Sequence, residues 1–156
     1  MADHVLEARV WLARPRPEVF AFFADPRNLL RVTAPHLRVR LRTACTQLAA
    51  GTVLDLDLRW LGLPLRSRLY IREYDPPYRF VDVQVRGPWA RWEHRHMFLE
   101  DNGGTWVEDR VTYRLPFGPL GRLVHGALVE RQLMLAWAYR QARLEALLAG
   151  DAAAAG

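Results

Sequence analysis

The chain has 156 residues, a length that predicts one domain with a sizeable core. Its formal charge is +5, and all 22 of its basic residues are arginine. The arginines alternate with apolar or acidic residues instead of forming runs, so we interpret them as solvated outer faces and expect no nucleic-acid partner. No apolar run is long enough to span a bilayer, which argues against stable membrane insertion.

The single cysteine, Cys45, excludes an internal disulfide, and the first ten residues lack the apolar region of a signal peptide. We therefore expect a cytoplasmic protein that is a monomer or a homodimer. Residues 1–149 are expected to form the single domain, and the alanine-rich residues 150–156 are expected to be a disordered tail.

The first predicted elements are a strand over 5–12 and two short helices. Pro17 suits a helix start, and Asp25-Pro26 separates this helix from a second short one over 28–32. Strict alternation of apolar and basic residues over 37–43 predicts the next strand.

The following two strands form a hairpin with one apolar and one charged face. We expect a turn around Leu61–Pro64 that places Trp60 opposite Leu65 and Asp57 opposite Arg68. Asp55 and Asp57 are therefore interpreted as surface partners of arginine and not as catalytic carboxylates. The apolar face carries Leu54, Leu56 and Leu58.

Three further strands are predicted over 78–85, 91–98 and 105–115. Asn102-Gly103 favours a type I′ turn, so Asp101 should lie opposite Gly104. The last element is a long helix over 120–148. Its apolar positions at helical spacing are Leu120, Val124, Leu128, Leu135 and Ala138, and the stripe is widened by Leu133, Trp137 and Leu144.

A run of strands with segregated helices indicates the α+β class. A single antiparallel sheet with one apolar face needs a cover, and the long helix is the only predicted element that is large enough to supply it.

The stretch RWEHRHMF, residues 91–98, places Trp92, His94, His96 and Phe98 on one face of its strand. The Asn-Gly register then puts His96 opposite Asp109 and Trp92 opposite Tyr113. All of these side chains should face the long helix.

Three interpretations compete for His94, His96 and Asp109. Two histidines and a carboxylate can bind Zn²⁺ or Fe²⁺. Alternatively, Asp109 can orient His96 for acid–base catalysis. We favour a third interpretation, in which Asp109 and His96 satisfy each other and orient a ligand in an apolar pocket, with no metal and no cofactor.

Asp82 and Gln84 share a face with Phe80. An odd-length turn at Gly87-Pro88 brings them beside His94 and Trp92, whereas a two-residue turn sends them outside.

Four features together carry a resemblance to a known family: the stretches 14–35, 78–98 and 105–121 and the helix that follows. Across nearly its whole length the chain resembles the polyketide cyclase/START-like superfamily, also called SRPBCC, and it looks closest to a branch of small bacterial proteins of mostly unassigned function. The resemblance implies a helix-grip fold, in which a curved sheet of about seven strands surrounds the C-terminal helix and leaves a deep apolar cavity. It also implies that Asp82 and Gln84 belong to the pocket.

The resemblance implies the binding or transport of a small hydrophobic ligand that is lipid-, polyketide- or aromatic-like. The expected walls are Trp92, Phe98, Tyr113, Leu56 and Leu58, and the expected polar groups are His94, His96 and Asp109. One alternative is a cyclase/dehydratase-type enzyme with His96 or His94 as its base and Asp109 behind it. A second alternative is an interaction module that uses the arginine-rich surface.

Overall fold

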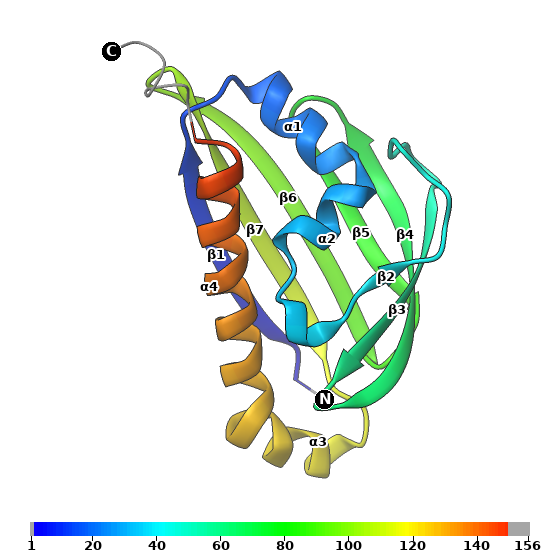
Figure 1. Ribbon diagram of the computed structural model, residues 1–156. Coiled ribbons are helices and arrows are strands. Elements are labelled where there is room, and N and C mark those ends of the chain that lie inside the picture. The colour runs from blue at the N-terminus through cyan, green and yellow to red at the C-terminus, as the bar shows by residue number, and fades with distance from the viewer. Residues whose placement is uncertain (1, 150–156) are drawn as a thin grey trace.

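The computed structural model describes residues 2–149, so the expected tail over 150–156 lies outside the described residues. Seven strands form one antiparallel sheet in the order β1-β7-β6-β5-β4-β3-β2 (Figure 1). The strands are β1 (His4–Leu12), β2 (Arg40–Leu41), β3 (Val53–Trp60), β4 (Leu63–Asp75), β5 (Arg79–Arg86), β6 (Arg91–Asp101) and β7 (Gly104–Arg114). The helices are α1 (Arg16–Ala24), α2 (Leu29–Val32), α3 (Gly118–Val124) and α4 (Glu130–Leu147), with short 3₁₀ turns at Pro26–Asn28 and Pro35–Leu37.

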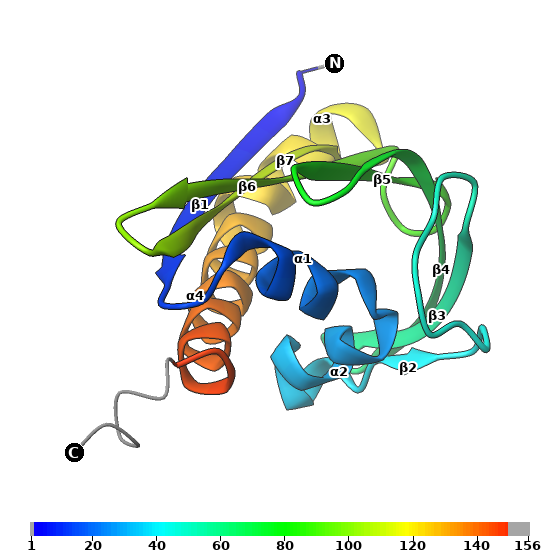
Figure 2. The same ribbon diagram turned by 90° about the horizontal axis from the view of Figure 1, so that it is seen from above.

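The sheet curls around the helices, as Figure 2 shows from above. Two register shifts interrupt the pairing of β4 with β5, one between Arg68 and Leu69 and one between Ile71 and Glu73. Such bulges bend a strand and increase its twist. Beyond this point, β4, β3 and β2 turn away from the plane of the other strands. The predicted α+β helix-grip fold is thereby confirmed.

The hairpin between β6 and β7 has the register that the sequence predicts. Asn102 and Gly103 both have positive φ angles, of 50° and 74°, as a type I′ turn requires. Asp101 consequently pairs with Gly104, and His96 pairs with Asp109.

The predicted register of the hairpin between β3 and β4 is wrong by two residues. The turn contains only Leu61 and Gly62, both with positive φ, so Trp60 pairs with Leu63. The shift is even, so every side chain keeps its predicted face. As a result, Asp57 lies opposite Arg66, while Arg68 lies opposite Asp55.

The outer face of the sheet carries charged side chains that pair with one another. Arg68 Nε lies 2.7 Å from Asp55 Oδ1, and Arg66 Nε lies 3.5 Å from Asp57 Oδ1. This pairing supports the interpretation of Asp55 and Asp57 as surface partners of arginine. Within the described residues, no helix is long and apolar enough to cross a membrane.

The strand predicted over 37–43 is mostly absent, because only Arg40 and Leu41 pair as β2. Pro35–Leu37 forms a 3₁₀ turn, and Arg38 adopts a left-handed conformation with a φ of 44°. The alternation of residue types therefore continues beyond the segment that has extended backbone.

The predicted stripe of the C-terminal helix is also corrected. A π-helical turn over His125–Val129 separates α3 from α4, and its wider turn changes which residues face the sheet. Leu120 and Leu135 are 63% and 53% exposed, whereas Leu133 and Leu144 are buried. The stripe is therefore centred on the residues that were expected only to widen it.

The main core lies where α1 and the end of α4 meet the sheet. Phe98 is 1% exposed, and its ring lies 5.1 Å from that of Phe20 and 5.2 Å from that of Phe23. Leu144 of α4 belongs to the same buried cluster. This core holds α1 against β6 and brings the end of α4 onto the same buried cluster.

Replacing Phe98 with alanine should lower the free energy of unfolding by about 3–5 kcal/mol, because it empties a closely packed site. Leu99→Ala is the matched control, since Leu99 is the next residue of the same strand and is 39% exposed. This control should cost less than about 1 kcal/mol. Urea denaturation of both variants measures the difference, and equal losses would contradict this account of the core.

Candidate functional site

A cavity of about 630 Å³ lies between the curved sheet and the helices. This volume is typical of a pocket for a small organic molecule. Most of its wall is aliphatic or aromatic, and the helix side is formed in part by Leu133 and Trp137. The sheet side includes Leu54, Leu56, Leu58, Trp60, Leu65 and Leu69.

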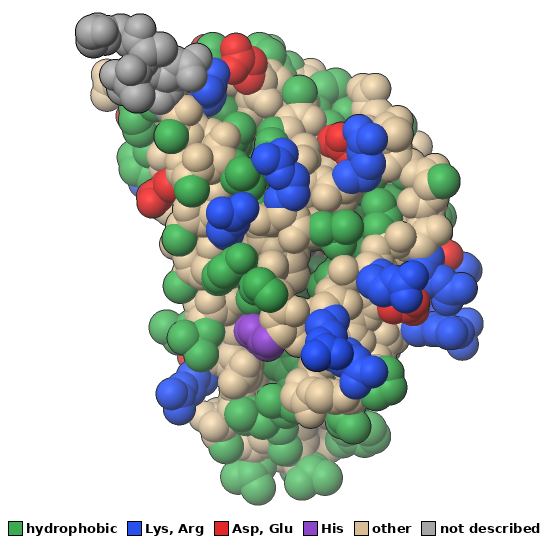
Figure 3. Space-filling model, in the orientation of Figure 1, with side chains coloured by type: hydrophobic (Ala, Val, Ile, Leu, Met, Phe, Trp, Pro, Cys, Tyr) green, Lys and Arg blue, Asp and Glu red, His purple; other side chains and the backbone are tan. Residues whose placement is uncertain are grey.

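The cavity has an exposed apolar rim at one end. Leu61 and Leu63 at the β3–β4 turn and Phe117 and Leu120 beside or within α3 line the cavity, yet each is more than half exposed. The turn and α3 lie at the same end of the molecule in Figure 1, and hydrophobic side chains gather at that end in Figure 3. Residues that both line a cavity and contact solvent mark its mouth.

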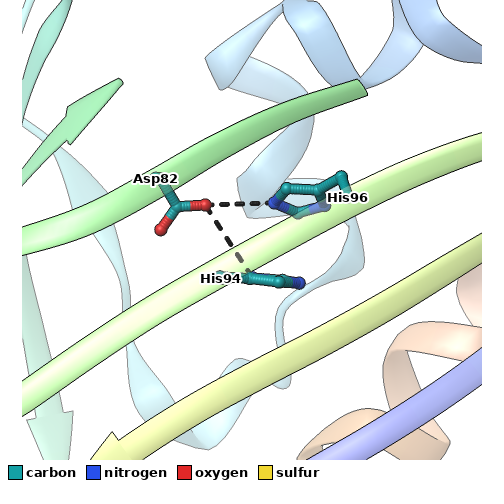
Figure 4. A group of neighbouring side chains, drawn as sticks. All are labelled: Asp82, His94 and His96. Atoms are coloured by element: carbon teal, nitrogen blue, oxygen red, sulfur yellow. Dashed lines mark hydrogen bonds and ion pairs between the residues drawn. The ribbon is translucent and has the colours of Figure 1, made fainter. Parts of the chain in front are cut away.

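Polar side chains meet on the wall formed by β5 and β6. Asp82, His94 and His96 all line the cavity and are all buried. Figure 4 shows Asp82 on one strand and the two histidines on the neighbouring strand, with Asp82 facing both imidazoles. His96 Nε2 lies 3.0 Å from Asp82 Oδ2, at hydrogen-bond distance. The rings of His94 and His96 are neighbours, with centroids 3.7 Å apart. Asp82 faces inward because it pairs directly with His94 in the sheet.

Asp109 of β7 lies behind the two imidazoles and does not line the cavity. Its Oδ1 atom is 2.8 Å from His94 Nε2, at hydrogen-bond distance. The same oxygen is 3.0 Å from His96 Nδ1, but that nitrogen lacks the alignment of a hydrogen bond. Asp109 and His96 thus lie at ion-pair distance, as expected, but the hydrogen bonds run differently: Asp109 bonds to His94, and Asp82 bonds to His96.

Arg140 of α4 supplies a positive charge beside this cluster. Its Nε atom lies 3.6 Å from Asp109 Oδ2, and its side chain is only 11% exposed. Burial would raise the pKa of Asp109, but Arg140 and the imidazoles lower it well below its ordinary value. Both effects act on Asp82 too, where the hydrogen bond with His96 contributes most to the lowered pKa.

The two histidines have opposite pKa shifts. Burial and the neighbouring His96 lower the pKa of His94. Burial also acts to lower the pKa of His96, but Asp109 and Asp82 outweigh it and raise that pKa. His96 thus takes up a proton first. When His94 is neutral and donates from Nε2 to Asp109, its lone pair is on Nδ1, on the side of Asp82.

Seven of the ten predicted ligand-binding residues line the cavity, and three do not. The seven are Asp82, Gln84, Trp92, His94, His96, Leu56 and Leu58. The open question about Asp82 and Gln84 is thereby answered, because both face inward. Phe98, Asp109 and Tyr113 face the same side of the sheet but lie behind the wall.

Packing explains why these three residues are not part of the wall. Phe98 belongs to the core beneath α1, and Asp109 is covered by the imidazoles. The Tyr113 hydroxyl lies 2.7 Å from His125 Nε2, so this tyrosine is held against the π-helical turn. Burial and the charge of Glu130 raise the pKa of Tyr113.

Two features of the site were not predicted. Arg140 lies seven residues after Leu133 and four before Leu144, so helical spacing placed a charged residue on the buried stripe. Trp89 lines the cavity with its ring 5.2 Å from Trp92 and 6.1 Å from Trp60. Residue spacing could have indicated Arg140, whereas the place of Trp89 depends on the path of the loop after β5.

Comparison with solved structures gives the class of this fold. Protein CV1439 from Chromobacterium violaceum is 14% identical, with a TM-score of 0.72 over 94% of this chain and 97% of that one. Major latex-like protein 151 from Panax ginseng is 13% identical, with a TM-score of 0.63 over 94% of this chain and 97% of that one. A nucleoside-diphosphate sugar epimerase from Corynebacterium glutamicum is 26% identical, with a TM-score of 0.64 over 89% of this chain but 28% of that one.

The structural neighbours are Bet v 1-like, or SRPBCC, proteins, and the chain has their helix-grip fold. This agrees with the resemblance seen in the sequence. No protein-family model and no curated protein matches the chain.

Replacing Arg140 with leucine should lower the free energy of unfolding by about 3–5 kcal/mol, because Asp109 keeps its buried charge but loses its partner. In an Asp109→Asn background the same change should cost less, with a coupling energy of about 1–3 kcal/mol. Arg131→Leu on the exposed side of α4 is the control and should change stability by less than about 0.5 kcal/mol. Additive losses in a double-mutant cycle would show that Arg140 acts independently of Asp109.

Proposed function

We propose that the protein binds a small hydrophobic ligand in this cavity and serves as its carrier or receptor. The observation that supports the proposal is the cavity of about 630 Å³, with its mostly apolar wall and its mouth of exposed leucine and phenylalanine side chains. When an organic molecule displaces water from a buried apolar surface of this kind, the free energy of the system falls. Proteins with this fold typically bind hydrophobic ligands.

The wall suggests the chemistry of the ligand. Trp60, Trp89 and Trp92 lie next to one another, and aromatic side chains of this kind suit a flat or unsaturated ring. The polar group of the ligand is expected to face His94 and His96, since convergent polar groups in an apolar pocket fix orientation. The proposed ligand is therefore largely apolar, contains a ring, and carries one polar end.

Filling the cavity from the sheet side should weaken ligand binding without unfolding the protein. Ser67 lines the cavity opposite Leu56, whereas its neighbour Arg66 points to the outer face with a side chain that is 81% exposed. Ser67→Trp should weaken binding of the apolar fluorescent probe 1-anilinonaphthalene-8-sulfonate at least tenfold. Arg66→Trp, the matched control, should bind it as the unmodified protein does.

The same three proteins can be tested with lipids and aromatic polyketides by thermal shift, and by native mass spectrometry after purification from the natural source. A retained ligand in the unmodified protein and in Arg66→Trp, but not in Ser67→Trp, supports the proposal. Equal probe binding by all three proteins, with no retained ligand and no thermal shift, would refute it.

A further inference from the structure

We propose that Asp82, His94 and His96 bind a divalent transition-metal ion on the wall of the cavity. The sequence favoured a polar pair over a metal site, because side chains two residues apart on a strand are nearly parallel and about 6.5–7 Å apart. The structure adds Asp82 from β5 as a carboxylate on the cavity side. This inference goes beyond the proposed function and does not depend on it.

The three side chains offer donor atoms at distances that suit one ion. The donor atoms all lie within 4.8 Å of one another. Two atoms bound to one tetrahedral ion at about 2.1 Å lie about 3.4 Å apart. Asp82 Oδ2 lies 3.0 Å from His96 Nε2 and 3.8 Å from His94 Nδ1, so the two distances fall on either side of that value. Small side-chain rotations would make both of them suitable.

Asp109 occupies the position that an outer-shell carboxylate takes in metal sites. Histidine ligands usually donate a hydrogen bond from the N–H of their other ring nitrogen to a carboxylate, which fixes the tautomer and the ring orientation. Asp109 Oδ1 lies 2.8 Å from His94 Nε2 and 3.0 Å from His96 Nδ1, the nitrogens that face away from Asp82. Arg140 forms an ion pair with the other oxygen of Asp109, Oδ2. Asp109 therefore hydrogen-bonds to one imidazole and lies at ion-pair distance from the other.

The lone pairs of His94 and Asp82 also point to an ion between these residues. With His94 Nε2 donating to Asp109, His94 Nδ1 and Asp82 Oδ2 present lone pairs to each other at 3.8 Å, beyond hydrogen-bond distance. The cluster contains two buried carboxylates, and its positive groups are the Arg140 guanidinium and a protonated His96. A divalent cation would accept the facing lone pairs and would replace the proton on His96 Nε2, so that positive charge stays beside both carboxylates.

The donor set favours Zn²⁺ or Fe²⁺. Two imidazoles and one carboxylate are typical of catalytic zinc sites and of non-haem iron sites, both of which keep positions open for water or substrate. Here the three side chains line the cavity, so the open positions would face its interior. A polar group on a bound hydrophobic molecule would then reach the ion directly.

The test is titration of tag-free, chelator-treated protein with Zn²⁺ alone, monitored by calorimetry. The unmodified protein should bind one ion. Asp82→Asn and His96→Gln should weaken binding at least 100-fold, and Asp109→Asn should weaken it about 10- to 100-fold, as loss of an outer-shell partner does. Two control variants change donors away from the cluster: Asp55→Asn removes a half-exposed carboxylate, and His36→Gln removes an exposed imidazole. Both variants should bind Zn²⁺ as the unmodified protein does.

Circular dichroism and thermal melting show whether each variant folds. If Asp82→Asn does not fold, Co²⁺ added to the unmodified protein gives a second measurement, since its visible spectrum should show nitrogen and oxygen ligands in a four- or five-coordinate site and should disappear on addition of Zn²⁺. No binding by the unmodified protein, or equal binding by folded Asp82→Asn and His96→Gln, would overturn the proposal. Failure of probe binding in the cavity would leave this result unaffected, because the titration contains no organic ligand.

Discussion

The register of the β6–β7 hairpin is the constraint on which the site depends. Asn102 and Gly103 accept positive φ angles, so the turn has two residues and Asp101 pairs with Gly104. A slip of one residue would turn every side chain of β6 to the opposite face. The imidazoles of His94 and His96 would then leave the concave side of the sheet, and Asp109 would no longer lie behind them.

The cost of burying these charges is met by their arrangement in pairs. An isolated buried carboxylate is expensive, and the energy is recovered only with good geometry and a nearby opposite charge. Asp109 has Arg140 on one oxygen and His94 on the other, whereas Asp82 has His96. Arg140 comes from α4, so the same interaction also joins the helix to the sheet. The chemistry of the site and the seating of the helix are therefore coupled.

The sequence was sufficient for the order of elements, the inward face of β6 and the partners across the β6–β7 hairpin, because alternation and turn residues are local signals. It was insufficient wherever backbone geometry adds or removes a residue. Because the turn at Leu61-Gly62 has two residues, Asp57 pairs with Arg66 and not with the predicted Arg68. Because of the π-helical turn, the buried stripe of α4 contains other residues than helical spacing predicts. The face on which Asp82 lies depends on the length of the loop after β5, and local residue patterns do not determine that length. Phe98 and Tyr113 were assigned to the correct face, but depth behind a wall depends on packing between distant elements.

The cavity at the centre of the fold has a thermodynamic consequence. Its apolar wall loses water and gains dispersion contacts when an organic molecule enters. A molecule that binds there and does not bind the unfolded chain shifts the folding equilibrium toward the native state, by an amount that grows with its concentration. Under the proposed function, the abundance of this protein in the cell would follow the supply of its ligand, because the ligand-bound form unfolds less often and is degraded more slowly.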